Sequence, residues 1–115
     1  MADVFDSVSA WLTVPDVAET LGVSPGRVRR YIEEHTLIAV KRDGVFKIPA
    51  ETIQDNEPLP SLKGTILVLI DSGFDVLGAT EWLYTLNDEL GRKPIESLVM
   101  GRKAEVRRVA QALAF

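Results

Sequence analysis

The chain has 115 residues, of which 46% are apolar and 26% charged, and its net charge at pH 7 is −4. This length fits one compact domain or two very small ones and excludes a large catalytic domain, while the apolar content argues against disorder. With no cysteine, disulfides and thiolate zinc sites are excluded. The longest apolar run, residues 66–70, is far shorter than the roughly 20 residues of a membrane helix, so we expect a cytoplasmic protein with no membrane partner.

Basic residues are concentrated in two segments of this acidic chain. Residues 24–50 carry six basic and three acidic side chains, and residues 92–108 carry six basic and two acidic ones. Residues 1–23 carry four acids and no base. Because the local field decides whether a phosphate backbone is attracted to one face, the total charge does not exclude a nucleic-acid interface.

The first predicted elements are two short helices joined by a tight turn. Thr13 is expected to cap a helix over residues 14–21, since a hydroxyl followed by proline and an early acid favours a helix start, and Gly22 ends it. Ser24, again followed by proline, repeats the start signal for a second helix over residues 25–34. Two helices joined by so short a turn must cross steeply.

Strand signals follow the second helix. Residues 37–40 are apolar, Asp43 and Gly44 form a strong turn pair, and residues 45–49 alternate between apolar and polar. The sequence therefore predicts a β-hairpin, or wing, with its basic part over residues 41–47.

The second half of the chain has helical signals. Two prolines within residues 56–61 indicate a boundary between an N-terminal domain, residues 1–57, and a C-terminal domain, residues 58–115. Residues 65–70 contain β-branched side chains and fit a strand as an alternative, but no partner strand is evident, which favours a helix. We expect a mainly α fold, a winged helix-turn-helix followed by a small helical bundle. The expected C-terminal helices cover residues 62–71, 76–86, 94–100 and 102–113.

Several residues of the N-terminal half match a known DNA-binding module. Ala18, Gly22 and Val28 stand where a helix-turn-helix needs a small contact, a turn and a packed second helix. Together with Gly44 in the wing, they make residues 11–54 similar to the module of MerR and excisionase regulators. Arg27 departs from the small polar residue that is common at its position in that family.

The second helix is expected to present a basic face to double-stranded DNA. Arg27 and Arg30 point outward near the helix start, where a guanidinium fork matches the acceptors of guanine in the major groove. Arg29 and Tyr31 suit phosphates, and Ser24 with the free amides of the helix start offers a further phosphate site. Additional contacts with the adjacent backbone or minor groove are predicted for Lys41, Arg42 and Lys47.

Other interpretations of these side chains remain open. The arginines could form a solvated face paired with Glu33 and Glu34 at helical spacing, although the turn and the basic wing favour DNA. Trp11 and Phe46 could stack on single strands, but their apolar neighbours favour the core. His35 has no acid or thiol cluster near it, and the acids are scattered, so we predict no metal, no cofactor and no enzymatic activity.

The C-terminal half resembles the helical domain of Xre/MbcA/ParS-type antitoxins. The resemblance rests on residues 79–87, with their tryptophan, on the glycine-proline turn within residues 90–98, and on the closing helix, residues 101–113. It implies a domain that binds a toxin or another protein, and a packing and dimerisation domain is an equal alternative. An apolar partner interface would lie around Trp82, Leu83 and Leu86.

Taken together, the two halves resemble a small actinobacterial family of winged-helix DNA-binding proteins that are reported as targets of Ser/Thr protein kinases. The resemblance implies a transcriptional regulator under phosphorylation control. A phosphate on Ser7, Ser9 or Thr13 would add negative charge to an acidic segment near the DNA-binding helix and weaken DNA binding. Thr13 could instead serve only as an N-cap. The alternative function is an antitoxin-like module that holds a protein partner through its C-terminal helices.

Overall fold

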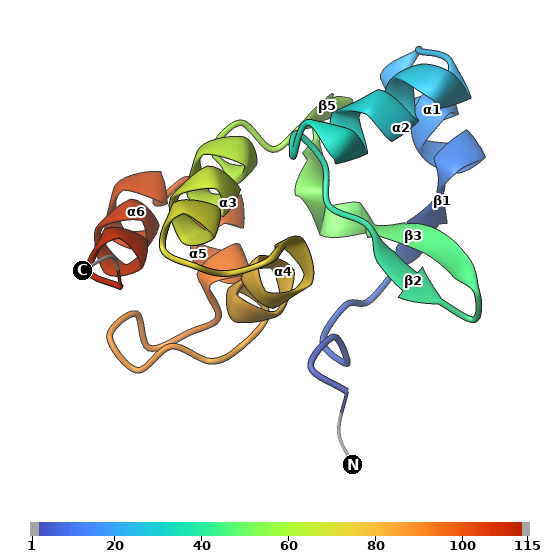
Figure 1. The fold of residues 1–115 in the computed structure, drawn as a ribbon. Coiled ribbons are helices and arrows are strands. Elements are labelled where there is room, and N and C mark those ends of the chain that lie inside the picture. The colour runs from blue at the N-terminus through green and yellow to red at the C-terminus, as the bar shows by residue number, and fades with distance from the viewer. Residues whose placement is uncertain (1–2, 114–115) are drawn as a thin grey trace. The chain divides into compact units, whose positions relative to one another are not determined.

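The computed structural model of the protein describes residues 3–113, which form two compact units (Figure 1). The first, here called the sheet unit, comprises residues 8–62. The second, here called the helical unit, combines residues 3–7 with residues 63–113 among those described. The chain therefore passes from one unit to the other twice.

Helix α1 (Val14–Leu21) begins and ends at the residues that the sequence predicts. Thr13 is its N-cap, and the Thr13 hydroxyl accepts a hydrogen bond from the Asp16 amide at 3.2 Å. The Asp16 carboxylate accepts one from the Thr13 amide at 3.1 Å, which completes a capping box. Gly22 ends the helix at φ 70°, in the left-handed region that glycine adopts without strain.

Helix α2 (Pro25–Glu33) follows after a short turn. The Ser24 hydroxyl accepts a hydrogen bond from the Arg27 amide at 3.1 Å and caps the helix, as predicted. The helix ends one residue earlier than expected because Glu34 takes the cap position and His35 then turns to φ 66°.

A three-stranded antiparallel sheet in the order β1-β3-β2 completes the core of the sheet unit (Figure 1). The strands β2 (Val40–Arg42) and β3 (Val45–Pro49) form the predicted hairpin, and both turn residues have positive φ, as a two-residue turn of this kind requires. Residues 37–39, predicted as part of the first strand, precede it. The strand β1 (Trp11–Thr13), which the sequence did not predict, pairs with β3.

The residues after the sheet are more regular than a linker. A 3-10 helix η1 (Ala50–Thr52) leads into the paired strands β4 (Ile53–Gln54) and β5 (Glu57–Pro58). Their two-residue turn, Asp55 and Asn56, again has positive φ. These elements belong to the sheet unit, which extends to Leu62.

One apolar cluster holds the two helices of the sheet unit on its sheet. Leu12, next to the turn into α1, and Ile32 of α2 pack at its edge. Since α2 contributes the fully buried Val28 to this cluster, its opposite face is directed to solvent. The buried members are Val17, Ala18, Val28, Leu37 and Ile48.

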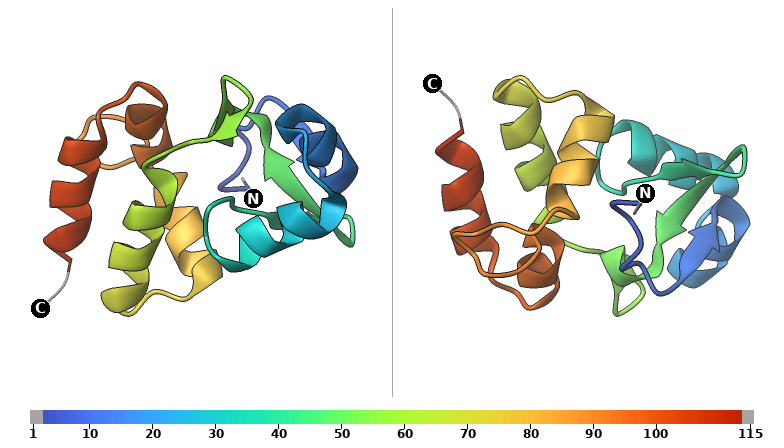
Figure 2. Two further views of the ribbon diagram at one scale, coloured as in Figure 1. Left: turned by 90° about the horizontal axis from the view of Figure 1, so that it is seen from above. Right: turned by 90° about the horizontal axis from the view of Figure 1, so that it is seen from below.

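The helical unit consists of four described helices and the segment before β1. Residues 65–70 are helical, as favoured over the strand alternative, within α3 (Leu62–Asp71). The helix α4 (Val76–Leu83) ends three residues earlier than predicted, because Tyr84 is its C-cap. The remaining helices are α5 (Pro94–Val99) and α6 (Lys103–Gln111), and α6 lies beside α3 in both views of Figure 2.

The core of the helical unit includes a residue from the beginning of the chain. Phe5 is buried, and the edge of its ring meets Tyr84 with ring centroids 5.3 Å apart. Leu83 is also fully buried, so its predicted place in an exposed partner interface is wrong, whereas Leu86 is 63% exposed. Leu83 fills the core because it lies on the face of α4 that also carries the buried Ala79.

Candidate nucleic-acid interface

The exposed face of α2 carries three arginines, Arg27, Arg29 and Arg30, on both sides of the buried Val28. Arg27 and Arg30 line a shallow hollow of about 380 Å³ at the beginning of α2, together with Ser24 and Gly26. The first amides of a helix have no intrahelical acceptor, and the helix dipole is positive at this end. The hollow therefore combines guanidinium groups, a hydroxyl and a helix N-terminus, all of which favour an anion.

Arg27 is held in place by Tyr31 one turn along the helix. Its Nε donates a hydrogen bond to the Tyr31 hydroxyl at 3.4 Å, and the guanidinium carbon lies 5.4 Å from the centroid of the Tyr31 ring. The hydrogen bond with Tyr31 raises the pKa of Arg27 above its ordinary value, with a smaller contribution from the charge of Glu34. The contact with Tyr31 thus favours the charged form of the Arg27 guanidinium.

The alternative interpretation, in which these arginines form ion pairs with Glu33 and Glu34, is wrong. Within residues 3–113, no carboxylate oxygen lies within 4.0 Å of the guanidinium nitrogens of Arg27, Arg29 or Arg30. Glu33 and Glu34 are both exposed at the end of the helix. The three guanidinium groups are thus available to an external anion.

The flank of α2 that faces the wing forms an apolar groove. Arg29, Ile32 and Glu33 of α2 line this groove of about 300 Å³ together with Val14 and Phe46. Phe46, expected in the core, is 55% exposed. The expectation was wrong because the apolar cluster of the sheet unit includes Ile48 of β3 but does not extend to Phe46.

The pleat of the wing divides its basic residues between two faces. Lys41 pairs with Phe46, and both lie on the face that carries the buried Ile48 and packs against the helices. Arg42 and Lys47 lie on the opposite face, because successive side chains of a strand point to opposite sides. Of the three wing residues predicted to contact DNA, only Lys41 therefore shares a face with α2.

Arg42 lies over the Trp11 ring on the far side of the sheet. Its guanidinium carbon lies 5.0 Å from the centroid of the Trp11 ring, within the range of a cation–π interaction. Trp11 is half-buried in β1. Its exposure is therefore intermediate between that of a core residue, which was expected, and that of a stacking platform, which was the alternative.

The three predicted phosphorylation sites have different surroundings. Ser7 and Ser9 are exposed and lie on either side of the point where the chain passes between the units. Thr13 is partly buried, and its hydroxyl serves the capping box of α1.

Metal-ligand clusters and membrane-spanning helices are both absent from residues 3–113. In that range, no three His, Asp or Glu side chains gather as metal ligands. In the same range, no helix is long and apolar enough to cross a membrane. His35 is partly buried in the turn after α2.

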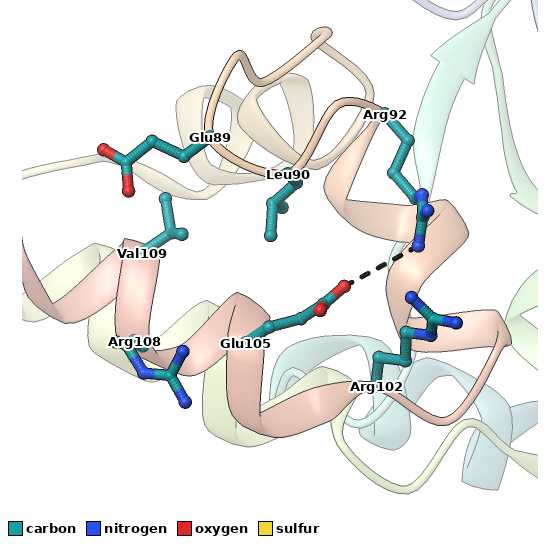
Figure 3. A pocket seen from close by; sticks show the side chains of 7 residues that line it. All are labelled: Glu89, Leu90, Arg92, Arg102, Glu105, Arg108 and Val109. Carbon is teal, nitrogen blue, oxygen red and sulfur yellow. Dashed lines mark ion pairs between the residues drawn. The ribbon is translucent and has the colours of Figure 1, made fainter.

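The second basic segment surrounds a hollow of about 210 Å³ in the helical unit (Figure 3). Arg92 lies 3.7 Å from the Glu105 carboxylate, which also accepts a hydrogen bond from the Ser97 hydroxyl at 2.9 Å. Figure 3 shows the guanidinium of Arg102 on the same side as that of Arg92. The hollow is thus mixed in charge, and Leu90 and Val109 give it an apolar part.

Comparison with known proteins covers both halves of the chain. A family model described as "DNA-binding protein Rv2175c, wHTH domain" matches residues 1–53, and one described as "Rv2175c C-terminal domain of unknown function" matches residues 59–114. The chain is 30% identical over 126 residues to the DNA-binding protein Rv2175c of Mycobacterium tuberculosis, across 98% of this chain and 86% of the relative. The NMR structure of Rv2175c superposes with a TM-score of 0.85 at 30% identity, across 99% of this chain and 87% of that chain. The fold is confirmed as a winged helix-turn-helix followed by a helical domain.

Proposed function

The chain belongs to the Rv2175c family of DNA-binding proteins, and from that premise we propose that it binds double-stranded DNA through α2 and acts as a transcriptional regulator. The observation that carries the proposal is the exposed arginine face of α2, whose guanidinium groups have no carboxylate within 4.0 Å in the described part of the chain. A basic face whose charges are not neutralised by nearby carboxylates matches the charge of a phosphate backbone.

In the proposed complex, α2 enters the major groove with its N-terminal turn first. Arg27 and Arg30 reach base edges from that turn, and the orientation of Arg27 is already set by Tyr31. Arg29, on the wing side of the helix, contacts a backbone phosphate, as does Lys41 on the same face of the wing. The phosphate contacts fix the position of the helix, and the base contacts carry any sequence preference.

Fluorescence anisotropy with a labelled 30-base-pair duplex, measured over a salt series, tests the proposal. We expect wild-type affinity to fall steeply with salt, by a slope of about 0.9 for each phosphate contact. Arg27→Ala/Arg30→Ala should lose most of the affinity. The matched control Arg102→Ala/Arg108→Ala removes two exposed arginines from the helical unit and should bind as wild type does. An equal loss in both double variants would contradict a site on α2, and no binding at low salt would contradict the function.

The proposal includes control by a Ser/Thr protein kinase acting on Ser7, Ser9 or Thr13. The exposure of Ser7 and Ser9 supports access by a kinase, and a phosphate in the acidic N-terminal segment would oppose DNA phosphates. Replacing each hydroxyl residue in turn by Asp should weaken binding at low salt. Unchanged affinity in all three variants would remove this part of the proposal.

A cytoplasmic location and the lack of enzymatic activity complete the proposal. Both accord with a regulator whose ligand is the DNA of the cell, because binding through α2 needs neither a cofactor nor a catalytic group. Recovery of the chain in the membrane or extracellular fraction of the cells would contradict the location.

An antitoxin-like interaction module is the second candidate function. It is favoured by two exposed apolar side chains of the helical unit, Leu86 at 63% and Met100 at 54%, the latter in contact with Arg92. Sedimentation velocity of the wild type and of Leu86→Glu tests the simplest partner, a second copy. A dimer that the variant abolishes would support an interaction surface at Leu86, and a monomer in both would exclude a second copy of the chain as the partner.

A further inference from the structure

The wing exposes two large apolar side chains beside its turn. Val45 is 52% exposed and Phe46 is 55% exposed, and only Asp43 and Gly44 lie between them and β2. An aromatic side chain that is left in water at a hairpin end loses the free energy that burial would provide. An exposed apolar side chain that borders an apolar groove, as Phe46 does, marks a candidate interaction site.

The two side chains face different surroundings. Phe46 lies on the same face as Lys41 and borders the groove against α2, where Arg29 forms part of the wall. Val45 lies on the opposite face, paired with Arg42. Phe46 is therefore the only one of the two that shares a face with the proposed DNA-binding helix.

The charges around Phe46 indicate what its partner is. Two basic residues adjoin Phe46: Lys41 is its partner in β2, and Arg29 of α2 lines the same groove. Two acidic residues are also near: Asp43 lies in the turn, and Glu33 of α2 lines the groove. The turn itself is thus acidic, and the strand face behind it is basic and aromatic. This arrangement fits a polyanion that meets the face of the wing, with an apolar site between its charges, and a DNA groove has these properties.

We propose that Phe46 is an apolar wedge that enters the minor groove of the DNA bound by α2 and unstacks a base step there. The inference rests on the proposed function, because α2 in the major groove is what brings the wing face to the neighbouring minor groove. Lys41 and Arg29 then contact phosphates on either side of the inserted ring. Side chains that act in this way kink the duplex by roughly 20–90°.

The wedge also predicts a sequence preference without hydrogen bonds to bases. Pyrimidine–purine steps such as TA unstack readily, whereas A-tracts are stiff. We expect the wild type to prefer a duplex with a central TA step over one of equal composition with a central A-tract. Phe46→Ala should lose this preference together with about tenfold in affinity, the loss typical of removing one aromatic–base contact.

Phe46→Ala and Val45→Ala form a matched pair for the test. Each removes one exposed apolar side chain from the same strand, but on opposite faces. Duplexes of 30 base pairs labelled at both ends report bending by energy transfer, and 2-aminopurine at the central step reports unstacking. Circular dichroism melting checks that both variants fold.

The expected result is bending and a rise in 2-aminopurine fluorescence with wild type and Val45→Ala, both of which Phe46→Ala loses. The salt slope of Phe46→Ala should equal that of wild type, because no phosphate contact is removed, whereas Lys41→Ala should lower it. Binding by Phe46→Ala with wild-type affinity and bending would overturn the wedge while leaving DNA binding intact. A loss of self-association in Phe46→Ala, measured by sedimentation, would assign the side chain to a protein interface instead. No binding by the wild type would overturn the proposed function itself.

Discussion

The side chain of Thr13 has both a structural and a proposed regulatory role, which substitution can separate. Its hydroxyl accepts a hydrogen bond from the Asp16 amide at 3.2 Å, and the Thr13 amide donates the reciprocal hydrogen bond to the Asp16 carboxylate at 3.1 Å. Thr13→Ala removes only the first bond, so we expect a loss of about 1 kcal/mol in the free energy of unfolding of the sheet unit. For a unit of this size the melting temperature should fall by about 5 °C.

Two further variants at this position keep the cap. Thr13→Ser retains the hydroxyl, and Thr13→Asp provides a carboxylate that is also a favourable N-cap and suits the positive end of α1. Both should unfold at nearly the wild-type urea concentration. If phosphorylation at Thr13 controls DNA binding, Thr13→Asp should lower the affinity for DNA without loss of stability, whereas Thr13→Ala should lower stability without a change in the salt slope.

Urea unfolding followed by the fluorescence of Trp11 measures the effect in the correct unit. Trp11 lies in β1, two residues before Thr13, and replacing the other tryptophan by Trp82→Phe leaves it as the sole reporter. Identical unfolding midpoints for Thr13→Ala and wild type would refute the role of the capping box.

Three other substitutions test the turn, the packing and the charge of the candidate interface. Gly22→Ala should destabilise the sheet unit by about 1 kcal/mol in urea unfolding, since φ 70° strains other residues, and unchanged stability would contradict this. Val28→Ala, at a fully buried position, should cost about 2 kcal/mol and loosen α2; a smaller loss than for Gly22→Ala would contradict it. Arg29→Ala should lower the salt slope of DNA binding by about 0.9, and Glu33→Gln should raise the affinity for DNA. A higher affinity for Arg29→Ala than for Glu33→Gln would refute phosphate contact at this flank.

Local signals in the sequence suffice for much of this fold. The hydroxyls at Thr13 and Ser24 and the glycine at position 22 predict α1, the turn and α2, because caps and left-handed turns depend on few neighbouring residues. The turn pair in the wing predicts the hairpin in the same way.

Features that depend on contacts between distant residues could not be predicted from the sequence. The strand β1 has three residues and exists because it pairs with β3, which lies more than thirty positions later. Phe5 belongs to the helical unit through its contact with Tyr84, although it precedes the sheet unit in the chain. The exposure of Phe46 depends on where the apolar cluster ends. Alternation along the strand could have separated Lys41 from Arg42 and Lys47, but only the register shows which face meets α2.

An NMR titration of the ¹⁵N-labelled chain with a 30-base-pair duplex tests the central claim most directly, because it reports every amide of both units at once. The largest shifts should fall on residues 24–31, with a second group on residues 41–47, and they should diminish as salt is raised. Shifts confined to residues 92–108 of the helical unit would contradict it, since the second basic segment would then be the one that meets DNA.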